Sequence, residues 1–178
     1  MILFVFYFLQ LLFVLQRGCV LTDDCNIMWY QDKELAIGFN HKPHTNMLEP
    51  LPGMSAEEVK LIEKYPFINY SNLDVKLFNH KKNKSYSFTI PKKFRWDGAT
   101  IAPVFWLLIG TKTDPRFKIP SMIHDFMCNN KDVVNFDRNF SSKVFRSLLI
   151  VSKVSKIKAQ TMYIAVDNFQ KFRKGWKG

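Results

Sequence analysis

The spacing of apolar residues changes at Pro91, and this change limits the folds that the chain can adopt. Before Pro91, residues 74–79 and 84–90 alternate apolar with polar side chains, as strands with one buried face do. The polar residues 80–83 between them predict a hairpin turn. After Pro91, four segments favour helices: the apolar run 101–109, then 118–129, 138–151 and 156–172. The sequence therefore predicts an α+β fold, in which a β-hairpin is followed by a small bundle of three or four helices.

Short sequence motifs predict where one further helix begins and ends. Residue spacing predicts which side of the last helix faces the core. Ser55 is followed three positions later by Glu58, which is the spacing of a capping box at a helix start. The pair Tyr65-Pro66 ends this helix, because the residue before a proline avoids the helical conformation. In the last helix four residues recur at helical spacing and predict a core stripe: Met162, Val166, Phe169 and Phe172.

The length of the chain bounds its domain organisation. Its 178 residues, 47% of them hydrophobic, suffice for one globular domain with a real core. We assign this single domain to residues 55–178. Residues 20–54 are polar and interrupted by prolines, which predicts a linker or wrapping segment. His41 and His44 lie in this segment, but Pro43 between them argues against a helix that would present both to a metal.

The first sixteen residues contain no charged side chain and are mostly leucine, phenylalanine, valine and isoleucine. This N-terminal hydrophobic segment has the length of the apolar region of an export signal. No basic residue precedes it, and Arg17 follows it, which leaves a short uncleaved anchor open. We therefore interpret residues 1–19 as a signal peptide or membrane anchor, and expect a membrane-anchored or secreted/periplasmic protein. A lipoprotein site at Gly18-Cys19 and an ordinary buried first helix are the alternatives.

Cysteine usage constrains the chain little. Cys19 and Cys25 are close enough in sequence to form a disulfide in an exported protein, which would leave Cys128 unpaired. No pair has the C-x-x-C spacing of a zinc or thioredoxin-type site.

Positive charge is concentrated in the second part of the chain. The net charge is +11, of which residues 111–178 contribute +9 and residues 1–110 only +2. A cationic surface of this size favours an anionic partner such as a membrane or anionic lipid surface. Nucleic acid is the less favoured partner, because no tight cluster of basic residues with interleaved aromatics is present.

Three polar residues in an otherwise apolar stretch form the candidate site. Asp97-Gly98 is a turn-type dipeptide between a predicted strand and an apolar run. His124 and Asp125 fall within a predicted helix and are flanked by methionine, isoleucine and phenylalanine. Adjacent helical residues point about 100° apart, so each should face a separate partner. A site for chemistry and a hydrogen-bonded core network both remain open.

The same stretch resembles a family of bacterial and phage proteins, the domain of unknown function 1353. The resemblance covers residues 89–166 and rests on Ile90-Pro91-Lys92-Lys93-Phe94, Asp97-Gly98-Ala99-Thr100-Ile101, Pro103, Phe105-Trp106, Ile109-Gly110, Ile123-His124-Asp125 and Arg138. It implies a phage- or mobile-element-type protein and no particular activity. The family pattern continues with an Ala-Asp pair, where this chain has Ser141-Ser142.

A looser similarity to prokaryotic phospholipase A2 implies a mechanism. It makes His124 the general base and Asp125 a catalytic residue and calcium ligand, with Asp97 completing the metal site. Asp137 would then take the place of the orienting carboxylate that Ser142 replaces. The supporting residues are Gly98, Thr100, Trp106, Asp137, Arg138 and Ser142. The sequence thus predicts a calcium-dependent ester hydrolase at the cell envelope, with a non-enzymatic accessory or structural binding module as the alternative.

Overall fold

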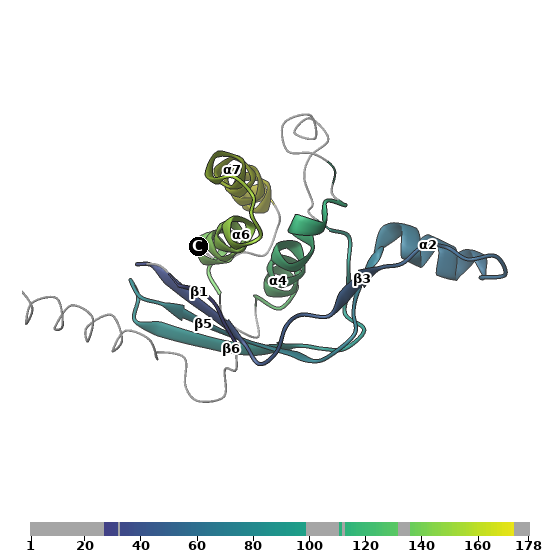
Figure 1. Ribbon diagram of the computed structural model, residues 1–178. Helices are drawn as coiled ribbons and strands as arrows, with labels where there is room; N and C mark the ends of the chain where they lie inside the picture. The colour runs from purple at the N-terminus through teal and green to yellow at the C-terminus, as the bar shows by residue number, and fades with distance from the viewer. Residues whose placement is uncertain (1–26, 32, 99–110, 112, 132–135, 173–178) are drawn as a thin grey trace, which may run out of the picture.

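The computed structural model describes residues 27–31, 33–98, 111, 113–131 and 136–172. Its main sheet has four antiparallel strands in the order β1-β2-β5-β6 (Figure 1). The strands are β1 (Ile27–Gln31), β2 (Leu35–Phe39), β5 (Leu73–Asn79) and β6 (Lys84–Ile90). The helices cover one face of this sheet (Figure 1). The α+β class predicted from the sequence is confirmed.

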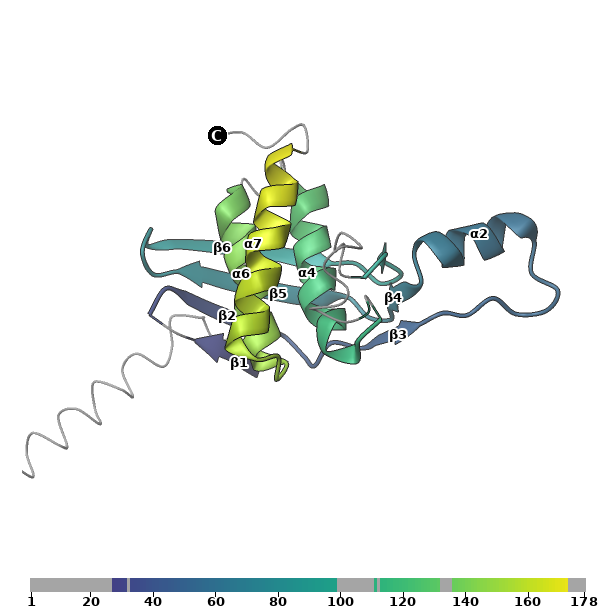
Figure 2. The same ribbon diagram turned by 90° about the horizontal axis from the view of Figure 1, so that it is seen from above.

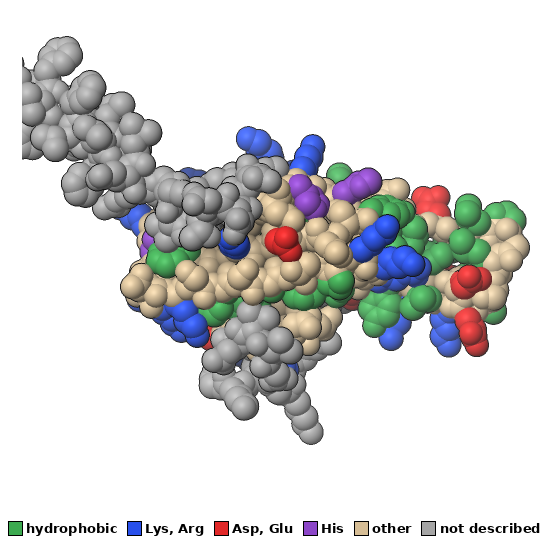
Figure 3. All heavy atoms as spheres, turned by 90° about the horizontal axis from the view of Figure 1, so that it is seen from below, with side chains coloured by type: hydrophobic (Ala, Val, Ile, Leu, Met, Phe, Trp, Pro, Cys, Tyr) green, Lys and Arg blue, Asp and Glu red, His purple; other side chains and the backbone are tan. Residues whose placement is uncertain are grey.

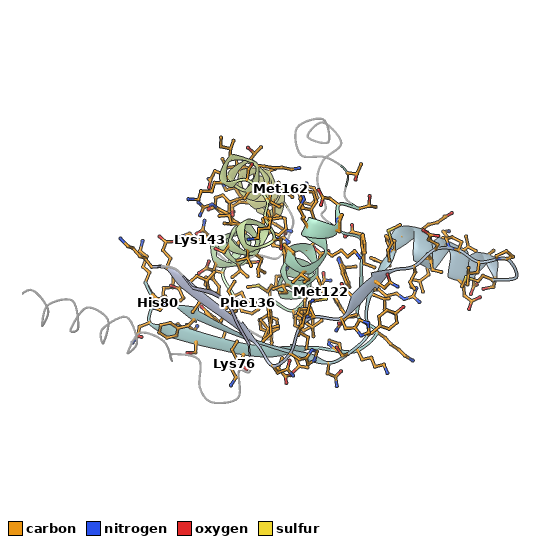
Figure 4. The ribbon with its side chains drawn as sticks, viewed as in Figure 1. Lys76, His80, Met122, Phe136, Lys143 and Met162 are labelled. Atoms are coloured by element: carbon orange, nitrogen blue, oxygen red, sulfur yellow. The ribbon has the colours of Figure 1, made fainter. Side chains whose placement is uncertain are left out.

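The predicted hairpin is formed by β5 and β6, which pair from Leu73 opposite Ile90 to Asn79 opposite Lys84. Alternate residues of β5 are buried beneath the helices, as the alternation in the sequence requires. Lys76 points to the other side of the sheet (Figure 4). Figure 3 views this other side and shows mostly backbone and polar side chains. The sheet therefore has one apolar and one polar face.

Three helices form two layers above the sheet: α4 (Lys118–Asn129), α6 (Arg138–Val151) and α7 (Lys156–Phe172), with a short 3-10 helix η2 (Pro115–Phe117) before α4. These bounds confirm the predicted bundle. Helices α4 and α6 lie on the sheet, and α7 packs on their outer side (Figures 1 and 2). Met122 and Phe136 fill the core next to the sheet, and Met162 fills a second core between α6 and α7 (Figure 4).

A smaller sheet extends the fold to one side. It has three antiparallel strands in the order β3-β4-β7, namely β3 (Thr45–Met47), β4 (Phe67–Asn69) and β7 (Arg95–Trp96). Helix α2 (Ala56–Lys64) joins β3 to β4 and projects away from the helical layers (Figures 1 and 2). Ser55 caps α2, and both halves of the predicted capping box with Glu58 are present. We call residues 41–72 the arm.

Residues 20–54 differ from the expected linker, because they contribute β1, β2 and β3. All five residues of β2 are buried, so the strand lacks the alternation of polar and apolar residues that would have revealed it. The predicted core stripe of α7 is only partly correct. Met162 and Val166 are buried, but the side chain of Phe169 is 46% exposed.

Some predictions fall outside the described residues. They concern the N-terminal hydrophobic segment with Cys19 and Cys25, and the apolar run 101–109 with Thr100 and Trp106. Among the residues that are described, no helix is long and apolar enough to cross a membrane.

Candidate functional site

Helix α4 places His124 between the two layers of helices, where only 5% of the residue is exposed. Ser121 and Cys128 lie one turn before and one turn after it on the same face of the helix. The Nε2 atom of His124 lies 3.5 Å from Sγ of Cys128. The imidazole ring also packs against Phe145 of α6, with ring centroids 5.2 Å apart. His124 is thus held by its own helix and by the neighbouring one.

Asp125 also approaches the imidazole from the adjacent position. Its Oδ1 atom lies 3.6 Å from Nδ1 of His124. This distance is too long for a hydrogen bond but short enough for an ion pair when the ring is protonated. The Asp125 carboxylate thus lies next to the imidazole without a hydrogen bond to it.

A small hollow of about 10 Å³ borders both residues. Its walls come from all three helices of the bundle, and its polar lining residues are Ser121, His124, Asp125 and Gln170. A volume of this size is at the lower limit for one water molecule. The arrangement offers room for a water beside the imidazole.

Asp97 and Gly98 follow β7 and are connected to α4 through the neighbouring Trp96. Its indole Nε1 donates a buried hydrogen bond of 3.1 Å to Oγ of Ser121. Asp97 is half-buried, and Gly98 has a φ of 90°, the left-handed conformation that a turn residue needs. The chain therefore bends at Gly98, next to the helix that carries His124.

The structure places Asp137 away from His124. Asp137 is the N-cap residue of α6, where its Oδ1 accepts a hydrogen bond of 2.6 Å from the backbone N–H of Phe140. Its Oδ2 lies 2.5 Å from Nζ of Lys82 in the hairpin turn. The carboxylate is occupied by these two contacts and does not border the hollow beside His124. Its role as the N-cap of α6 explains why Asp137 does not take the place of an orienting carboxylate at His124.

A carboxylate from α7 lies beside Ser142 instead. Oδ1 of Asp167 accepts a hydrogen bond of 3.3 Å from Oγ of Ser142 and forms an ion pair with Arg138. Both Ser142 and Asp167 are buried. The predicted supporting residues Arg138 and Ser142 thus bind α6 to α7.

Sequence reasoning missed Cys128 and Asp167. Cys128 lies four residues after His124, a helical spacing that could have identified it. Asp167 had no comparable signal, since it reaches Ser142 from another helix. Metal binding finds no support in these positions, because the described part of the chain contains no group of three or more histidine, cysteine or acidic residues that could hold a metal ion.

Comparison with known proteins identifies one family. A family profile described as "Protein of unknown function (DUF1353)" matches residues 73–166, from β5 into α7. Neither the curated proteins nor the solved structures gave a match. The matched segment is more than half of the chain, and it contains the hairpin, His124 and Asp125. The chain belongs to the family of proteins of unknown function DUF1353.

Proposed function

We propose that this protein is a binding module that acts at an anionic membrane surface and docks through the outer face of α7. The observation that supports the proposal is the exposure of two large apolar side chains on this face, Ile157 and Ile164; Phe169 is also exposed, but it borders the hollow beside His124. Ile157 is 83% exposed, Ile164 50% and Phe169 46%. Ile157 and Ile164 are two helical turns apart and therefore lie on the same side of α7.

The charges of α7 favour an anionic partner for this apolar face. Lys156 and Lys171 are exposed on the same helix, and Lys153 precedes it. The only carboxylate of α7 is Asp167, which is buried and paired with Arg138. The sequence after α7 adds Arg173, Lys174, Trp176 and Lys177. Helices that lie in the interface of anionic membranes combine exposed apolar residues with lysine, and their sequences are often rich in arginine and tryptophan.

Vesicle binding tests the proposal. We would compare sedimentation of the full chain with vesicles of phosphatidylcholine alone and with vesicles that also contain phosphatidylglycerol. The double variant Ile157→Gln/Ile164→Gln should lose the phosphatidylglycerol-dependent binding by roughly tenfold, because two inserted side chains become polar. High salt should weaken the same component of binding.

The matched control is Leu61→Gln, which changes an apolar side chain that is 44% exposed on α2. It should bind like the wild type. Docking through α7 would be refuted if the α7 double variant bound the vesicles with phosphatidylglycerol as tightly as the wild type.

Hydrolysis at His124 is a second candidate function, favoured by the 3.6 Å contact between its Nδ1 and Oδ1 of Asp125. In this function His124 accepts a proton from a water in the adjoining hollow, and Asp125 stabilises the resulting charge. Calcium was expected at Asp97 and Asp125; the described residues contain no group of three or more side chains that could hold a metal ion, and the proton transfer above is written without calcium. The test is fatty-acid release from mixed phospholipid vesicles, with and without calcium. Equal release by the wild type and His124→Ala would exclude this function.

A further inference from the structure

A second hollow lies on another side of α6 and has a volume of about 470 Å³. Three segments that are distant in sequence line it: the connection from β1 to β2, the β5–β6 turn, and the first turns of α6. A hollow of this size is in the range of small-molecule sites, about 300–1,000 Å³. We call it the α6 groove.

Positive charge predominates in the α6 groove. Its lining contains five cationic side chains, Lys81, Lys82, Arg138, Lys143 and Arg146, and two carboxylates, Glu34 and Asp137. Three of the cations are already paired. Lys82 binds Asp137, Lys143 lies 3.1 Å from Glu34, and Arg138 binds Asp167 of α7. Figure 4 shows Lys143 on the side of α6 that faces the end of the sheet.

Arg146 and Lys81 are the two cations of the groove that no described residue neutralises. The Nε atom of Arg146 is buried and has no hydrogen-bond partner within the described residues. A buried donor without a partner costs free energy, and Arg146 is also one of the residues that line the groove. Lys81 is exposed in the β5–β6 turn at the same groove. Together they provide a guanidinium and an ammonium group for one anion.

We propose that the α6 groove binds a phosphate group carried by a small organic molecule, with Arg146 and Lys81 as its cationic contacts. Phosphate matches the fork of donors on a guanidinium better than a single chloride ion does. Inorganic phosphate alone would leave most of a 470 Å³ hollow unfilled. Leu35 and Phe140 in the lining offer apolar contacts for the organic part of the ligand. The proposal is independent of membrane docking through α7.

The paired carboxylates set the strength of this binding. Asp137 and Glu34 compete with the ligand for Lys82 and Lys143, respectively. Removing the charge of Glu34 frees Lys143 and reduces repulsion of the phosphate. Glu34→Gln should therefore bind the ligand about twofold or more tightly, which is the size of effect expected for an exposed ion pair.

Titration calorimetry of the full chain with glycerol 1-phosphate, and with glycerol as its uncharged counterpart, tests the proposal. We expect binding of the phosphate only, and a loss of roughly tenfold for Arg146→Gln. Lys81→Gln should also weaken binding, and because Lys81 is exposed this variant tests the site without disturbing the core. Lys60→Gln on α2 removes the same charge away from the groove and should change binding less than twofold.

Two sources of the phosphate can be distinguished with phosphatidylglycerol vesicles. If the ligand is a lipid headgroup, Arg146→Gln weakens vesicle binding and glycerol 1-phosphate competes with the vesicles. If the ligand is a soluble phosphate, Arg146→Gln abolishes glycerol 1-phosphate binding and leaves vesicle binding unchanged. No binding of glycerol 1-phosphate at millimolar concentration, or equal losses for Arg146→Gln and Lys60→Gln, would overturn the proposal. The α7 variant Ile157→Gln/Ile164→Gln should bind glycerol 1-phosphate normally.

Discussion

The indole N–H of Trp96 donates a buried hydrogen bond to the hydroxyl of Ser121, and this contact joins the strand before Asp97 to the helix that carries His124. Ser121 also donates to the backbone carbonyl of Lys118 within its own helix, at 3.0 Å. The indole has no such second partner in the hydrogen bonds described. Removal of the Ser121 hydroxyl should therefore leave the indole N–H of Trp96 without a hydrogen-bond acceptor.

Ser121→Ala should lower the free energy of unfolding by about 1–3 kcal/mol, because it leaves the buried indole N–H without an acceptor. Urea denaturation followed by circular dichroism measures this change. Ser121→Thr keeps a hydroxyl and is the control for the lost hydrogen bond. Stability of Ser121→Ala equal to that of the wild type would show that the bond contributes nothing.

The ion pair of Arg138 with Asp167 should stabilise the packing of α6 against α7. Asp167→Ala leaves the half-buried guanidinium of Arg138 without its carboxylate, and we expect a loss of about 3 kcal/mol in unfolding free energy. Lys171→Ala is the matched control, since Lys171 lies 3.9 Å from the same carboxylate and is half-exposed. It should cost less than about 0.5 kcal/mol. Similar losses in the two variants would contradict this account.

Asp137 should make stability depend on acid pH. Burial raises the pKa of Asp137, but the hydrogen bonds from Lys82 and from the Phe140 N–H, with the charges of Lys82 and Lys143, lower it more. The folded-state pKa is therefore below that of the unfolded chain. Its contribution to stability is fully present above the unfolded pKa of about 3.9 and is lost as the pH falls through the lower, folded-state pKa.

Asp137→Asn isolates this contribution, because asparagine is also a good N-cap residue. Urea midpoints measured between neutral pH and about pH 2 should fall less steeply for the variant than for the wild type. Parallel pH profiles would show that the Asp137 carboxylate is not linked to folding.

The capping box of α2 should control the local stability of the arm. Ser55→Ala removes the side-chain acceptor for the backbone N–H of Glu58 and should cost about 1 kcal/mol. Hydrogen exchange of the α2 amides is the suitable measurement, because α2 projects from the body and exchange reports the opening of single elements. Ser55→Asp retains an acceptor and should restore protection. Unchanged exchange in Ser55→Ala would exclude a stabilising cap.

The sequence predicted those elements whose two sides differ in polarity. The hairpin β5–β6 and the helices α4, α6 and α7 each bury one side, so their periodicity could be recognised. Strand β2 is buried along its whole length and has no such periodicity, while β3 and β4 have only three residues each. The exposure of Phe169 could not be predicted either, because its spacing matches that of the buried residues on α7.

The sequence could predict those residues of the candidate site that are close together in the chain. His124 and Asp125 were identified because a polar pair is unusual within an apolar helix. The position of Asp167 beside Ser142 depends on how α7 packs on α6, which local spacing does not determine. The α6 groove was missed for the same reason, since its cations come from the β5–β6 turn and from α6.

The insertion of the arm between β2 and β5 has a consequence for the speed of folding. Asn40 and Asp74 clamp the ends of these strands with a hydrogen bond of 2.8 Å, although 34 positions separate them in the chain. The main sheet therefore forms only after this long loop has closed, and such distant pairings slow folding. The entropic cost of closure rises slowly with length, by about 0.6 kcal/mol for each doubling. Insertions within the arm should thus be tolerated far better than insertions in the short hairpin turn between β5 and β6.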